Sequence, residues 1–70
     1  MNKFVKLSLS HYKLGIKCFV RGCIHYAIGR FYDIVRNMEK ADKHYNLAYE
    51  YGKLADFSLE MARSLIDLAD

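Results

Sequence analysis

Small residues recur every seven positions in both halves of the chain, and apolar residues accompany them. The stretch LGIKCFVRGCIHYAIG, residues 14–29, carries a glycine at every seventh position. Alanine repeats at the same interval from Ala41 to Ala69, beside the column Leu47, Leu54, Met61 and Leu68, and polar side chains occupy the opposite face. Residues seven apart lie on one face of a helix. The pattern therefore predicts two long helices, over about residues 4–36 and about residues 41–69.

The polar run RNMEKADK, residues 36–43, separates the two patterns. Its charges fit the end of one helix and the start of the next, because Arg36 suits a C-terminus and Glu39 and Asp42 suit a first turn. Asn37 can serve as a helix cap or as a left-handed turn residue. We therefore predict a turn at about residues 37–40, so that residues 1–70 form a single helical domain.

Folding the chain between Met38 and Glu39 brings the two columns of small residues face to face. This register pairs Gly15 with Ala62, Gly22 with Ala55, Gly29 with Ala48 and Ser8 with Ala69, and a shift of one heptad would also align the columns. A glycine inside a helix costs about 1 kcal/mol relative to alanine, and close backbone contact would offset that cost. The predicted fold is an all-α antiparallel hairpin with a helix seam made by Gly15, Gly22, Gly29, Ala48, Ala55 and Ala62.

The first predicted helix is apolar on nearly every face from residue 18 to residue 35. One neighbouring helix cannot cover such a surface, and a chain of 70 residues holds only a small core. We therefore expect self-association into a helical bundle, such as a homodimer, or a docked partner protein. Aromatic residues and arginine anchor protein interfaces. The candidates for partner binding are Tyr12, Phe19, Tyr26, Phe31, Tyr32, Tyr49, Phe57, Arg21 and Arg30.

Charge is distributed unevenly between the halves. Residues 1–37 hold seven Lys or Arg and one acidic residue, whereas residues 38–70 hold four Lys or Arg and seven acidic residues. The two halves can neutralise each other by packing together. Alternatively, the basic first helix meets a phosphate backbone, because its cations are interleaved with tyrosines. An RNA- or DNA-binding regulator is therefore the alternative to a protein-binding module.

Parts of the chain resemble the tetratricopeptide repeat. In HYKLGIKCFVRGCIHYAIGRF the matching residues are Leu14, Gly15, Gly22, Ala27 and Phe31. In YNLAYEYGKLADF, 33 residues further on, the first part of the pattern returns at Leu47, Ala48, Tyr51, Ala55 and Phe57. The resemblance implies two helix pairs, with helices ending near Gly22 and Ala55, and binding of a peptide or protein. Two such pairs are the alternative to one straight hairpin.

The sequence gives little support for catalysis or metal binding. His11, Cys18 and His25 share one column of the first helix, but residues seven apart lie about 10 Å apart along a helix, too far to hold one ion. His44 stands alone near the turn. Phosphate-binding glycine motifs and a nucleophile elbow are not found. We expect a protein that is not an enzyme and needs no cofactor or metal.

The cysteines and the apolar runs indicate a compartment. Cys18 and Cys23, five residues apart, fit neither a CxxC motif nor a disulfide framework, which indicates reduced thiols. The first basic residues are followed by the mixed run LSLSHYKLG rather than by the apolar segment of a signal peptide. Charges interrupt the most apolar region, so that no membrane span is expected. These features predict a cytoplasmic protein.

These observations together predict a small binding protein. A short chain of one helical domain without a catalytic motif resembles, in size and style, the inhibitors, antirepressors and adaptors that phages and other mobile elements encode. Such proteins act by contact with a partner protein. We therefore expect binding of a partner protein as the function.

Overall fold

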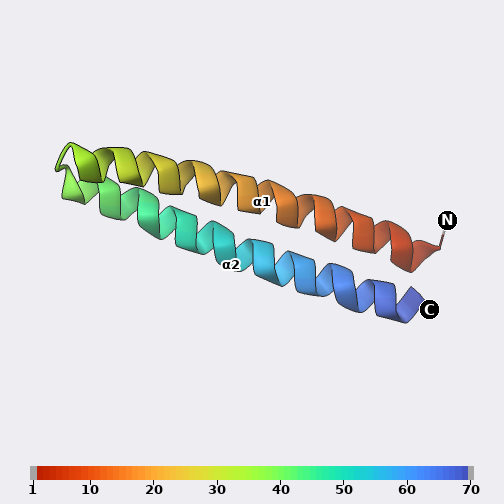
Figure 1. The fold of residues 1–70 in the computed structure, drawn as a ribbon. Helices are drawn as coiled ribbons and strands as arrows, with labels where there is room; N and C mark the ends of the chain where they lie inside the picture. Colours follow the sequence, from red (N-terminus) through yellow and green to blue (C-terminus); the bar gives the residue numbers. More distant parts are fainter. Residues whose placement is uncertain (1, 70) are drawn as a thin grey trace.

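Residues 2–69, which the computed structural model describes, form two antiparallel helices joined by a short turn. α1 spans Lys3–Ile34 and α2 spans Met38–Ala69, and the hairpin is 51 Å long. The start of α1 and the end of α2 lie at one end of the molecule, and the turn lies at the other (Figure 1). The predicted all-α antiparallel hairpin is confirmed.

α1 begins at a capped end and ends in a Schellman motif. The Asn2 side chain accepts a hydrogen bond from the Phe4 N–H at 2.8 Å, which satisfies one free donor of the first turn. At the other end the Asn37 N–H donates to the Tyr32 carbonyl at 2.8 Å. The Arg36 N–H donates to the carbonyl of Asp33 at 3.1 Å. These two bonds satisfy carbonyl groups that the end of a helix leaves free.

The turn is shorter and earlier than the predicted residues 37–40. Arg36 has a φ of 63°, so that a residue with a side chain occupies the left-handed position that usually holds glycine. Asn37 then caps α2, because its Oδ1 accepts a hydrogen bond from the Lys40 N–H at 3.3 Å. Three residues, 35–37, are therefore sufficient for the reversal, and α2 begins at Met38 rather than at about residue 41.

The small residues lie between the helices, but the predicted register is wrong by one heptad. A Cβ atom at Gly15, Gly22 or Gly29 would lie 3.3 or 3.4 Å from the carbonyl oxygen of Ala55, Ala48 or Ala41, respectively. At the end of the hairpin away from the turn, Ser8 contacts Ala62 rather than Ala69. Each residue of the first column therefore meets the alanine seven positions earlier than predicted. The reason is the short turn, which moves the centre of the reversal toward residue 36.

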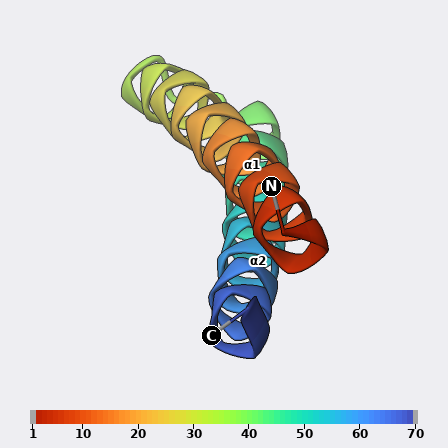
Figure 2. The ribbon, with the colours of Figure 1, turned by 90° about the vertical axis from the view of Figure 1, so that its right-hand side faces the viewer.

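Both helices are continuous along their length. α1 passes through Gly22 and α2 passes through Ala55 without a break, although the alternative with two helix pairs requires helix ends at these places. The structure therefore has one long helix pair. The axes of the two helices are inclined to one another, as the view along the molecule shows (Figure 2).

Candidate protein-binding groove

The contact between the helices buries small residues and leaves large apolar residues outside. Within residues 2–69 the buried hydrophobic residues are Cys18, Ala41, Ala55 and Ala62. The exposed large hydrophobic residues include Leu7, Leu9, Tyr12, Leu14, Ile16, Phe19, Val20, Ile24, Tyr26, Phe31, Ile34, Tyr49, Leu54, Phe57 and Leu68. Soluble monomers rarely expose large continuous apolar patches. This hairpin therefore carries surface suited to contact with another molecule.

An apolar groove of about 630 Å³ lies on one flank of the seam, between α1 and α2. It is lined by Phe19, Gly22, Cys23, Tyr26, Tyr45, Ala48, Tyr49 and Gly52. Its volume falls within the range of about 300–1,000 Å³ that is usual for binding pockets. Because each helix provides one wall, the groove is open to an apolar side chain or to an apolar helix face.

Gly52 lines this groove, and a side chain at this position would extend into open space. A Cβ atom at Gly52 would meet no atom within 4 Å, whereas a Cβ atom at Gly22 would lie 3.3 Å from the backbone oxygen of Ala48. Packing within the hairpin therefore disfavours a side chain at position 22 but not at position 52. A glycine inside a helix costs about 1 kcal/mol relative to alanine. No contact within residues 2–69 offsets that cost at Gly52.

The aromatic walls of the groove are held by neighbouring side chains. The rings of Tyr26 and Tyr45 are tilted toward each other with centroids 5.6 Å apart. The Tyr45 hydroxyl donates to Oδ2 of Asp33 at 3.3 Å, and the Lys53 ammonium lies 4.7 Å from the centre of the Tyr49 ring. Such contacts restrict the positions of these rings.

The environment of the Tyr45 phenol shifts its titration. Desolvation is the largest cause that raises its pKa above the ordinary value of 10.0, and the nearby negative charge of Asp33 is the next. The hydrogen bond to Asp33 acts in the same direction, because the phenol must keep its proton to donate it. Tyr45 is therefore neutral, with its hydroxyl directed away from the groove toward Asp33, at neutral pH.

A ladder of four rings occupies the other flank of the seam. Tyr32, His44, His25 and Tyr51 follow one another along it and come alternately from α1 and α2, with successive centroids 5.6, 5.2 and 5.5 Å apart. The Nδ1 atoms of His25 and His44 lie 3.0 Å apart in a hydrogen bond. Residues three and four positions after a seam glycine lie on opposite flanks of a helix. The ladder is therefore separated from the groove by the seam.

The structure gathers some of the predicted binding residues and disperses the others. Phe19, Tyr26 and Tyr49 line the groove. Tyr32 belongs to the ring ladder, and its ring meets Phe31 edge to face. Tyr12, Phe31, Phe57, Arg21 and Arg30 are exposed outside the groove. Of the seam residues, the three glycines, Ala55 and Ala62 are buried, whereas Ala48 is half-buried and lines the groove.

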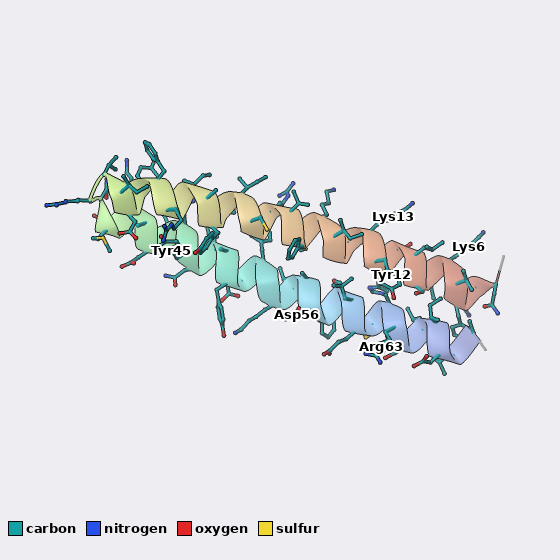
Figure 3. The ribbon with its side chains drawn as sticks, viewed as in Figure 1. Lys6, Tyr12, Lys13, Tyr45, Asp56 and Arg63 are labelled. Atoms are coloured by element: carbon teal, nitrogen blue, oxygen red, sulfur yellow. The ribbon has the colours of Figure 1, made fainter. Side chains whose placement is uncertain are left out.

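Most basic residues of α1 lie on the face of the helix that points away from α2. Lys6 and Lys13 point away from α2, whereas Tyr45 lies between the two helices (Figure 3). Lys17 and Arg21 follow Lys13 by four and eight positions in the same helix and therefore lie on the same outer face. A phosphate backbone is followed best by a single basic stripe. These cations form such a stripe, so the nucleic-acid alternative stays a prediction.

Two features of the surface were not predicted from the sequence. Gly52 had a visible signal, since it interrupts the apolar column Tyr45, Leu59 and Ile66. The sequence gives no signal for the contact between His25 and His44, because the predicted register places these two residues apart. Only the pairing one heptad away brings the two rings together.

Comparison of the chain with models of known protein families, with curated protein sequences and with solved structures finds no match. Neither α1 nor α2, over the residues described, carries an apolar stretch sufficient to cross a bilayer.

Proposed function

We propose that this protein is a non-enzymatic protein-binding module, and that the groove beside Gly52 receives a large apolar side chain from a helix of its partner protein. The observation that carries this proposal is the free space at Gly52, where a Cβ atom would meet nothing within 4 Å. A helix that lies along a groove binds through apolar side chains on one face. Tyr26, Tyr45 and Tyr49 would surround the inserted side chain.

The tyrosine walls support this assignment. Tyr and Trp dominate binding energy at protein interfaces, because they combine a large apolar area with one polar group and few rotatable bonds. Tyr49 is 64% exposed and Phe19 is 60% exposed, so that both have large areas left to bury. A partner that covers them gains hydrophobic free energy of about 25 cal/mol for each Å² removed from water.

Self-association is the second part of the proposal. Large apolar side chains are exposed on α1 outside the groove, among them Leu7, Leu14, Val20 and Ile24. A hairpin of two helices with a core of glycine, alanine and serine is small, and domains of this size commonly gain stability by oligomerisation. A second copy of the chain would cover this surface and leave the groove for the partner protein.

The biological role consistent with such a module is that of an inhibitor, an antirepressor or an adaptor. A protein that binds by contact alone can block or reshape a surface of its partner. The size of the chain matches that of binding proteins encoded by phages and mobile elements, which is an analogy of size and style.

Retention experiments with immobilised protein test the groove. The matched variants are Gly52→Leu, which fills the groove, and Lys43→Leu, which adds the same side chain at an exposed position outside it. We expect a specific protein from a cell extract to be retained by the wild type and by Lys43→Leu and to be lost from Gly52→Leu. Circular dichroism of Gly52→Leu should show unchanged helix content, because the position is open.

Salt and nuclease separate the protein partner from the nucleic-acid alternative. Contacts with phosphates weaken steeply between about 50 and 200 mM salt, whereas an apolar interface responds little. We expect retention to persist in moderate salt and after nuclease treatment. Equal retention by Gly52→Leu, or loss of the bound material after nuclease treatment, would show that the proposal is wrong.

A further inference from the structure

The His25 and His44 side chains bring two metal-ligating nitrogens together from different helices. Their Nδ1 atoms lie 3.0 Å apart, and both rings are half-buried. The ring planes are inclined by only 22°, and the centroids lie 5.2 Å apart. This separation equals the distance between the nitrogens plus about 1.1 Å for each ring, as in an in-plane hydrogen bond. The two rings therefore meet edge to edge.

One imidazole must donate its Nδ1 proton to the lone pair of the other, because two lone pairs or two N–H groups cannot face each other favourably. When that proton is carried on Nε2 instead, both Nδ1 lone pairs face the same point. Two nitrogens that bind one zinc ion at about 2.0–2.1 Å with tetrahedral angles lie about 3.3 Å apart. The observed pair needs a few tenths of an ångström of opening and a rotation of each ring by about 35°, because lone pairs that point at each other must converge at the tetrahedral angle.

We propose that His25 and His44 together bind a divalent ion of the late first-row metals, such as zinc or nickel, through their Nδ1 atoms. Neutral imidazole is a favoured ligand of these ions. Within residues 2–69 no third His, Cys, Asp or Glu joins the pair, so that water completes the coordination shell. The half-buried position keeps the ion accessible to that water.

The flanking tyrosines position the two histidines. Tyr51 stacks on His25 at 5.5 Å with an interplanar angle of 4°, and Tyr32 stacks on His44 at 5.6 Å with an angle of 14°. Because the four rings alternate between the helices, each imidazole is confined between a ring of the other helix and its histidine partner. The ion would therefore link α1 to α2 near the turn, on the flank that faces away from the groove.

Metal titration of the untagged chain tests this site. An ion that binds the folded hairpin and not the unfolded chain raises the melting temperature. With 1 mM zinc or nickel we expect the melting temperature to rise by about 5–10 °C relative to the same sample in EDTA. Magnesium, which prefers oxygen ligands, should cause no change.

Variants assign the effect to residues. His25→Ala and His44→Ala should each abolish the shift, measured against their own melting temperature in EDTA. His11→Ala is the matched control, because His11 lies two heptads from His25 in the same column and should leave the shift intact. An unchanged shift in His25→Ala, or no shift in the wild type, would overturn the proposal.

Nuclear magnetic resonance gives a readout that does not depend on stability. Substoichiometric paramagnetic nickel should broaden the imidazole signals of His25 and His44 and leave those of His11 sharp. Equal broadening of all three histidines would show that the ion binds imidazoles individually and would also overturn the proposal.

Discussion

The Ser8 hydroxyl donates a hydrogen bond of 2.7 Å to the carbonyl oxygen of Ala62, and neither residue is exposed to solvent. These residues are 54 positions apart in the chain and lie near the end of the hairpin where α1 begins and α2 ends. A hydroxyl buried without a partner would cost about 1–3 kcal/mol. In the register predicted from the sequence Ser8 would face Ala69, so this bond, together with the short turn, distinguishes the observed register from the predicted one.

Substitution of two glycines on facing helices tests the seam. Gly22→Leu places a side chain against the Ala48 carbonyl and the Tyr51 side chain, whereas Gly52→Leu places the same side chain in open space. We expect Gly22→Leu to lower the free energy of unfolding by about 2 kcal/mol or more, since overpacked contacts of this kind cost about 1–3 kcal/mol. Gly52→Leu should not destabilise the protein. Chemical denaturation measures the free energy of unfolding of both variants. Equal losses would contradict the close packing of the helices at Gly22.

Arg36→Gly should stabilise the hairpin. Arg36 has a left-handed backbone with a φ of 63°, which costs a residue with a side chain about 1–2 kcal/mol. Glycine adopts this conformation freely but has more conformational freedom in the unfolded chain, which reduces the gain to about 1 kcal/mol. Thermal unfolding should show a rise of about 5 °C. Arg36→Ala is the control that keeps the side-chain strain, and a similar rise in that variant would contradict the explanation.

Alkaline conditions should weaken the fold through Tyr45. Its pKa is higher in the folded chain than in the unfolded chain, first because of desolvation and next because of Asp33. The folded state therefore holds the phenol proton more tightly. The resulting stabilisation is complete below the pKa of the unfolded chain, about 10, and is lost as the pH rises through the higher pKa of the folded chain. The free energy of unfolding, measured between pH 8 and 11, should fall less steeply for Tyr45→Phe than for the wild type. A wild-type slope in Tyr45→Phe would contradict this explanation.

The sequence was sufficient to predict the architecture because two signals agreed. Glycine and alanine columns with one period predict a close helix pair, and the polar run between them predicts a reversal. Prediction of the register requires the number of residues in the turn. That number depends on the left-handed backbone of Arg36. No sequence rule favours arginine at that position, since glycine or asparagine is usual there.

The candidate site was predicted only in part, for the same reason. Phe19, Tyr26 and Tyr49 were candidates because aromatic side chains exceed what the hairpin can bury. The groove itself depends on which residues face each other across the seam, and the predicted register does not place Gly52 opposite the correct neighbours. The histidine pair depends on register even more strictly, because a shift of one heptad separates the two rings by about 10 Å.

The solution mass, measured by light scattering over a dilution series, tests whether a second copy of the chain covers the apolar surface of α1 outside the groove. The chain has a mass of 8.2 kDa. We expect at least twice this mass at tens of micromolar protein, unchanged between low and moderate salt because the contact is apolar. A mass of 8.2 kDa at every concentration, in a protein that stays soluble and folded, would contradict it.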